Sequence, residues 1–345
     1  MTKQRVLYYD VLNICACLCV VFLHFNGLVH SYESGPNWPQ SLIIEVLCYW
    51  AVPIFFMLSG ATLMNYRERY STRDFLKRRF TRTVIPFLFW SLSIIVLKVV
   101  LGNVDLSGWT FYTWVDYVMN AKVEPVYWFF IPLFSIYLCM PVLSFLTEDK
   151  HRKTLWYAVT LSGLLYGTLP IISLSIGFPW NSGLNIPVLG GYLIFVVLGY
   201  LLSTTDIPKR YRICLYVLGV FSALMRYVFT YRQSIIEGQT VRTYFDYLQF
   251  HSIFLAVGVF VLFKQIPWEK IFKTDKSQRV IAKISSCSFG IYLIHMLLQR
   301  VCKYVLNVPE NGLVWRLILP IFVYLVGLLI VYVMKNIPII KRIVP

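Results

Sequence analysis

The sequence predicts an all-α integral membrane protein, a polytopic bundle of about ten transmembrane helices. Of its 345 residues, 58% are hydrophobic and only 14% are charged. Apolar stretches of about twenty residues, the length that crosses the hydrocarbon core as a helix, recur along the whole chain. Because the bilayer interior offers no water to backbone groups, long apolar runs of this kind favour helices that satisfy their own hydrogen bonds.

The apolar stretches define ten predicted spans. The first is longer than the apolar part of a signal peptide and has no small-residue cleavage site behind it, so we expect it to remain in the protein. No loop between spans has the length of a soluble domain, so we expect residues 1–345 to form a single transmembrane domain. The spans cover residues 7–29, 41–64, 83–101, 125–147, 154–176, 188–204, 213–231, 248–265, 284–306 and 314–334.

The positive charges predict the orientation. An even number of spans places both termini on one side, and that side then holds 24 of the 32 lysines and arginines. The opposite loops hold only Lys122, Arg232 and Arg242. The positive-inside rule therefore makes both termini cytoplasmic. The net charge of +16 suits the anionic surface of a lipid bilayer, and we expect no nucleic acid partner.

The first span carries a polar face. His24 lies in the apolar run 19–26, where an ionisable group is costly and indicates a wet cavity or a functional site. Asn13, Cys17 and His24 share one stripe of the helix, with Asp10 one turn earlier and about 16 Å between Asn13 and His24. The alternative is that His24 only donates a hydrogen bond to a neighbouring helix.

The ninth span carries a second polar face. Spacings of three and four residues place its polar side chains on one stripe, which cannot be stable against lipid. We expect this stripe to line the same cavity as the first span. Its members are Ser285, Ser288, Tyr292, His295 and Gln299.

Arg79 and Arg82 lie three residues apart beside the third span. On an α-helix they would share one face and present two planar donor forks that suit phosphate oxygens. Docking of an anionic ligand is one interpretation, and simple orientation with lipid-headgroup contact is the other. The eight cysteines show no metal-site or disulfide spacing, so we expect them to pack in the core and expect no metal site.

Several short motifs follow one another along the chain at characteristic places. In this order they resemble the acyltransferase-3 family of bacterial integral-membrane acyltransferases, and in particular its small members that consist of the membrane domain alone. The motifs are Tyr9-Asp10-Val11-Leu12 before Val20-Val21-Phe22-Leu23-His24, Ala51 to Ser59-Gly60, Arg79-x-x-Arg82 before Ile85-Pro86, Trp128-Phe129 with Tyr137 and Pro141, Leu198-Gly199-Tyr200, and Ser288 to His295.

The resemblance implies transfer of an acyl group, usually acetyl, from cytoplasmic acetyl-CoA to a hydroxyl of a cell-surface or lipid-linked carbohydrate. It implies a multi-pass protein of the bacterial cytoplasmic (inner) membrane. Acetyl-CoA would be the acyl-donor substrate, and no tightly bound cofactor is expected. Two other functions stay open: a permease for a small solute that uses His24 and His295 as a proton relay, and a non-catalytic partner in polysaccharide synthesis.

By resemblance His24 is the catalytic residue, and Arg79 and Arg82 engage the donor. Many members have arginine eleven residues before the histidine; this chain has Asn13 there, which can hydrogen-bond to a donor but carries no charge. With an ordinary pKa of about 6.5, imidazole suits either the role of general base or that of acyl carrier. The predicted cavity-lining residues are Asp10, Ser59, Ser288, Tyr292 and His295.

Three arginines lie in the outer half of predicted spans, where cations are otherwise rare: Arg226, Arg300 and Arg316. As a hypothesis they hold the phosphates of a lipid-linked acceptor. The alternative is that they extend to the outer headgroups or pair with Glu45, Asp105 or Asp116.

Overall fold

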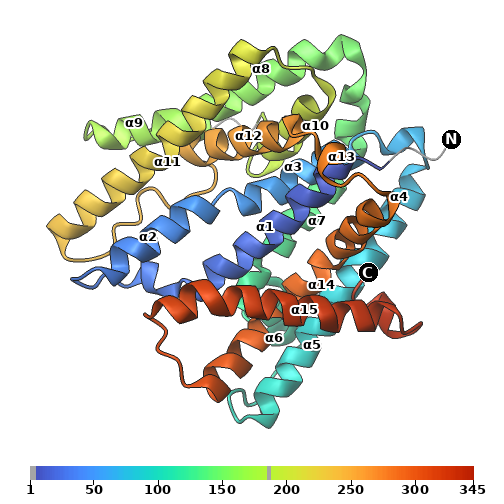
Figure 1. The fold of residues 1–345 in the computed structure, drawn as a ribbon, viewed down its shortest axis with the longest axis vertical. Helices are drawn as coiled ribbons and strands as arrows, with labels where there is room; N and C mark the ends of the chain where they lie inside the picture. The colour runs from blue at the N-terminus through green and yellow to red at the C-terminus, as the bar shows by residue number, and fades with distance from the viewer. Residues whose placement is uncertain (1–4, 185–187) are drawn as a thin grey trace.

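The computed structural model describes residues 5–184 and 188–345. This part of the chain is helical and contains no β-strand. Figure 1 shows the arrangement, in which α1 crosses the middle of the molecule. The helices are α1 (Leu7–Phe25), α2 (Asn37–Cys48), α3 (Ala51–Leu63), α4 (Thr72–Arg79), α5 (Ile85–Val100), α6 (Phe111–Met119), α7 (Phe130–Leu143), α8 (Arg152–Ser162), α9 (Leu169–Ser175), α10 (Leu193–Thr204), α11 (Lys209–Glu237), α12 (Phe250–Gln265), α13 (Trp268–Ile271), α14 (Asp275–Leu306) and α15 (Leu319–Lys335).

The predicted polytopic membrane architecture is confirmed. Within the described residues, 8 helical segments are long and apolar enough to cross a membrane. Two of these segments each contain two helices: α2 and α3 lie within Asn37–Glu68, and α4 and α5 lie within Thr72–Val100. Two shorter apolar helices, α10 and α12, occupy the remaining two predicted spans. The protein is therefore a multi-pass membrane protein.

The beginning of α1, the first third of α14 and the end of α15 lie together. The Arg5 guanidinium donates to the Ala282 carbonyl oxygen at 3.1 Å, and the Lys335 ammonium donates to the Ser286 carbonyl oxygen at 2.7 Å. Figure 1 shows the beginning of α1 and the end of α15 on the same side of the molecule. An even number of crossings accounts for this arrangement. The assignment of this side to the cytoplasm stays a prediction.

Glycine allows α3 and α10 to approach closely. A Cβ atom on Gly60 would overlap the Val196 carbonyl group, and one on Gly199 would overlap the Met57 carbonyl group. Small residues at such positions let membrane helices pack backbone to backbone. The opposite face of α3, which includes Phe55 and Ser59, borders the central cavity. Close packing behind α3 therefore fixes one wall of that cavity.

Candidate active site

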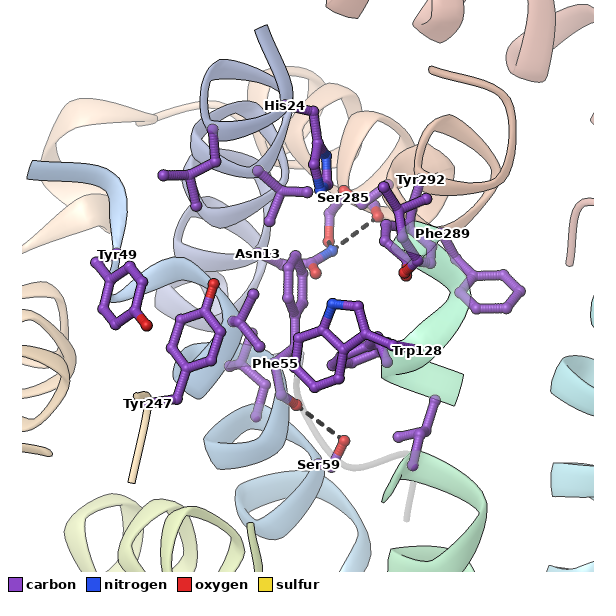
Figure 2. A pocket seen from close by; sticks show the side chains of 18 of the residues that line it. Asn13, His24, Tyr49, Phe55, Ser59, Trp128, Tyr247, Ser285, Phe289 and Tyr292 are labelled. Carbon is purple, nitrogen blue, oxygen red and sulfur yellow. Dashed lines mark hydrogen bonds between the residues drawn. The ribbon is translucent and has the colours of Figure 1, made fainter. Parts of the chain in front are cut away.

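A cavity of about 730 Å³ lies along α1. Its α1 lining runs from Tyr9 through Asn13 to His24, a rise of about 22 Å at 1.5 Å per residue. Figure 2 shows His24 and Ser59 at opposite ends of the drawn side chains, with Asn13 between them. The cavity therefore extends through most of the length of a membrane-spanning helix.

The polar stripes of α1 and α14 face each other, as predicted. The Asn13 side-chain amide donates to the Ser285 carbonyl oxygen at 2.9 Å and to its hydroxyl oxygen at 3.0 Å (Figure 2). The Gln299 amide donates to the His24 carbonyl oxygen at 2.6 Å. These contacts align the two helices over about three turns.

The two histidines meet at the far end of this contact. Nε2 of His295 lies 2.8 Å from Nδ1 of His24, and Nδ1 of His295 lies 2.7 Å from the Tyr292 carbonyl oxygen. His295 is fully buried, whereas the His24 ring is only partly buried and borders the cavity. His295 thus lies behind His24, which differs from its predicted place on the cavity wall.

The hydrogen bonds fix the tautomers of the neutral rings. A carbonyl oxygen only accepts, so Nδ1 of His295 carries the proton that it donates to Tyr292. Nε2 of His295 is then an acceptor, and His24 donates to it through Nδ1–H. Nε2 of His24 is left with a free lone pair. Such a nitrogen can accept a proton or attack an electrophilic carbon.

The other predicted cavity residues Asp10, Ser59, Ser288 and Tyr292 do border the cavity. Asp10 is held by Arg5 through bonds of 2.6 and 2.7 Å, and the Tyr292 hydroxyl donates to the Val126 carbonyl oxygen. The buried Ser288 hydroxyl has no hydrogen-bond partner among the described residues. It is therefore available to a ligand in the cavity.

Arg79 and Arg82 do not share one face, and this part of the sequence prediction was wrong. Arg79 borders the main cavity, whereas Arg82 borders a separate surface hollow of about 300 Å³ together with Lys77 and Arg78. The cause is the π-helical turn Phe80–Val84, which holds more residues per turn than an α-helix and rotates Arg82 away from Arg79.

The Arg79 guanidinium is positioned by aromatic rings. Its Cζ lies 5.8 Å from the ring centroids of both Phe75 and Tyr137. Its Nε is buried and has no hydrogen-bond partner among the described residues. A buried donor without a partner is costly, so this group is suited to hold an acceptor atom of a ligand.

The three outer arginines are bonded to other protein groups. Arg226 is 1% exposed and pairs with Glu45 at 3.4 Å, one of the partners that the sequence suggested. Arg300 pairs with Glu124 at 2.5 Å. Arg316 is fully buried and donates to the Asn37 carbonyl oxygen at 2.9 Å. None of the three is among the residues that border the cavity.

Aromatic residues that the sequence did not assign to a cavity form another part of the wall. Tyr49, Phe55, Trp128 and Tyr247 all border the cavity (Figure 2). They come from distant parts of the chain and have no shared local pattern, so no signal in one sequence could group them. No group of three histidine, cysteine, aspartate or glutamate side chains in the described residues could hold a metal ion.

Comparison with known proteins identifies the family. The sequence profile described as "Acyltransferase domain" matches residues 6–334, nearly the whole chain. No curated protein and no solved structure shows a significant match. The matched region contains the cavity, both histidines and both arginines of the predicted motifs. The chain therefore belongs to the acyltransferase-3 family of membrane acyltransferases.

Proposed function

We propose that the protein transfers an acetyl group from cytoplasmic acetyl-CoA to a hydroxyl of a cell-surface or lipid-linked carbohydrate, with His24 as the reacting side chain. One observation supports this most strongly: a single cavity is bordered by Arg79, by His24 and by the loop residue Arg242. Donor and acceptor can thus approach one histidine from opposite ends. The proposed location is the bacterial cytoplasmic membrane.

The donor end combines a surface hollow and a cavity wall. Lys77, Arg78 and Arg82 border the hollow and would hold the phosphates of the nucleotide part of acetyl-CoA. Arg79 borders the cavity, where its unpaired Nε–H can donate to a carbonyl or phosphate oxygen. The acyl-bearing arm would then extend past Asn13 toward His24. The amide nitrogen of Asn13 already donates to Ser285. We therefore propose that Asn13 mainly fixes the cavity wall and makes at most one hydrogen bond to the acyl-bearing arm.

In a direct route, Nε2 of His24 accepts the proton of the acceptor hydroxyl while the hydroxyl oxygen attacks the thioester carbonyl. The C–O bond forms, the C–S bond breaks, and the CoA thiolate takes the proton from His24. His295 leaves Nε2 of His24 free to take up this proton, because Nε2 of His295 accepts the hydrogen bond from Nδ1–H of His24. Correctly placed general bases contribute about 10²–10⁴-fold in rate.

In a carrier route, Nε2 of His24 attacks the thioester carbonyl, the C–S bond breaks and the CoA thiolate leaves. The Nδ1 proton passes to His295, which leaves a neutral acyl-imidazole. The acceptor hydroxyl then attacks the acyl carbon, the C–N bond breaks, and the Nδ1 proton returns to His24. The hydroxyl proton ends on the CoA thiolate through water. Both routes use the same nitrogen.

The test supplies purified protein in proteoliposomes with radiolabelled acetyl-CoA and envelope glycan, and compares wild type with His24→Asn. We expect labelled glycan with wild type and none with the variant. Label that stays on wild-type protein when glycan is omitted supports the carrier route, and its absence supports the direct route.

The matched control is His151→Asn, which removes a histidine at the start of α8 that does not border the cavity. This variant should transfer label at the wild-type rate. A folded His24→Asn variant that transfers label as fast as wild type would overturn the proposal. Solute uptake without a labelled product would instead support the permease.

A further inference from the structure

A second hollow, of about 450 Å³, adjoins the outer end of the main cavity. Trp128, Arg242, Phe245 and Tyr247 border both spaces, so the hollow and the cavity share a wall. Three of these residues belong to the segment between α11 and α12. A molecule in the hollow would therefore lie next to the space that His24 borders.

Two residues of the shared wall, Trp128 and Tyr247, belong to a column of nearly parallel aromatic rings. The Tyr49 and Tyr247 ring centroids lie 4.1 Å apart with an interplanar angle of 16°. The Tyr247 and Trp128 centroids lie 6.0 Å apart with an angle of 18°. Figure 2 shows Tyr49 and Tyr247 side by side on the cavity wall. Of these rings, Trp128 and Tyr247 give both spaces an apolar aromatic wall.

A buried ion pair holds this column in place. The Arg226 guanidinium carbon lies 3.5 Å from the ring centroid of Tyr49, and Tyr49 is the residue that stacks with Tyr247. Arg226 also pairs with Glu45 and donates to the Tyr244 carbonyl oxygen at 2.8 Å. These contacts join α2, α11 and the segment before α12. The rings are thus preorganised, which lowers the entropy cost of binding a ligand.

Polar groups surround the rings in the hollow. Arg242 and Asp246 are exposed there, and Gln249 also borders the space. Flat apolar surface beside donors and acceptors suits a ring that carries hydroxyls on its edge and C–H groups on its faces.

The charges argue against a phosphate group in the same place. The hollow has one cation, Arg242, and one anion, Asp246. A carboxylate beside the cation opposes a second anion. The arginines that the sequence suggested as phosphate ligands, Arg226, Arg300 and Arg316, are bonded to other protein groups and do not border the hollow.

We infer that the outer hollow binds an uncharged sugar ring of the acceptor, packed against Trp128 and Tyr247 and hydrogen-bonded by Arg242 and Asp246. The acceptor is thus recognised by its sugar and not by a phosphate. This inference rests on the proposed function, because the sugar is an acceptor only if the protein transfers an acyl group to it. Sugar binding can still be measured without any acyl transfer.

The experiment measures binding of tritiated, uncharged, deacylated oligosaccharides from the envelope of the source cells by equilibrium dialysis. The protein is held in nanodiscs of uncharged lipid. Trp128→Leu should weaken binding about tenfold, the size of a lost aromatic contact. Trp128→Phe, which keeps a ring, should weaken it less. Trp109→Leu, at an aromatic cluster outside both spaces, should bind as wild type does.

A second arm adds isoprenyl phosphate or inorganic phosphate as competitor. We expect neither to displace the oligosaccharide. Displacement by phosphate, or equal binding by Trp128→Leu and wild type, would overturn the inference. Binding of radiolabelled CoA to every variant tests whether the variant is folded. If Trp128→Leu no longer binds CoA, Tyr247→Leu is measured in its place. Sugar binding without label transfer would retain the inference and reject the proposed function.

Discussion

The two ends of the cavity are built differently. At the inner end Arg79 is half-buried with an unpaired Nε, and Ser288 has an unpaired hydroxyl. At the outer end Tyr49, Tyr247 and Trp128 form a stacked column that is held by the buried pair of Arg226 and Glu45. The inner end therefore offers polar atoms that need a partner, whereas the outer end offers a rigid apolar surface. Two chemically different substrates fit this difference better than one.

His24 borders the same cavity, at the opposite extreme of the drawn lining from Ser59 (Figure 2). Its ring is held from behind by His295, which no ligand contacts directly because it is fully buried. Changes at the histidines should therefore affect turnover, changes at the inner end should affect the donor, and changes at the outer end should affect the acceptor. The following variants test this separation, from the largest expected effect to the smallest.

His295→Leu should lower kcat by about 10²–10⁴-fold, the range for loss of a correctly held catalytic base. Leucine cannot accept the Nδ1 proton of His24, so the tautomer is no longer fixed. His295→Gln keeps an acceptor oxygen and should recover part of the activity. The KM for acetyl-CoA should stay within about twofold in both variants, because neither changes Arg79. A raised donor KM with normal kcat would place His295 in donor binding instead.

Arg226→Met should destabilise the protein by about 3–5 kcal/mol, because it leaves the buried Glu45 carboxylate without its partner. The double variant Arg226→Met with Glu45→Leu should be close to wild type in stability. Thermal unfolding in detergent measures both. If the double variant is stable but has a raised acceptor KM and a normal donor KM, the ion pair acts by holding the aromatic column. Equal stability of the single variant and wild type would contradict the pairing.

Arg79→Gln should raise the KM for acetyl-CoA by about 10–100-fold, as expected for a lost hydrogen bond to a charged group. Arg82→Gln should have a smaller effect that vanishes in high salt, because Arg82 lies on the exposed surface. Arg210→Gln serves as the control, because Arg210 is exposed and borders neither the main cavity nor the hollow beside Arg82. Steady-state kinetics with varied acetyl-CoA give the values. Equal effects of the Arg79 and Arg82 variants would favour one shared site.

Gly60→Ala should lower the free energy of unfolding by about 1–3 kcal/mol, the usual cost of an overpacked core. The added methyl group overlaps the Val196 carbonyl and pushes α3 from α10. Gly163→Ala is the matched control, since its new methyl would meet only the Ile194 Cδ1 atom at 3.9 Å. If both variants unfold at the same temperature, the close approach of the two helices is not needed for stability.

Helical periodicity was enough to predict the parts of the fold and site that depend on one helix at a time. The polar stripes of α1 and α14 follow from spacings of three and four residues, and the structure places them in contact. His24 and His295 are 271 residues apart, and shared chemistry alone suggested that they belong to one place. That His295 lies behind His24 could not be predicted, because periodicity gives the face of a residue but not its depth.

Predictions failed where the local geometry departs from the α-helix or where partners come from distant segments. Arg79 and Arg82 diverge because a π-helical turn follows Arg79, and no residue pattern announces that turn. Arg226 finds Glu45 at a separation of 181 residues. Tyr247 lies in a segment between helices, where aromatic residues have no periodicity that would connect them to Tyr49.

The most direct test of the central claim, that the acyl group crosses from the Arg79 end to the Arg242 end past His24, is a sidedness measurement. Proteoliposomes of one orientation, with the cytoplasmic face outward, receive impermeant radiolabelled acetyl-CoA outside and envelope glycan either trapped inside or added outside. The account predicts labelled glycan only when the glycan is inside, and none with His24→Asn. Labelled glycan formed only when both substrates are outside would contradict it.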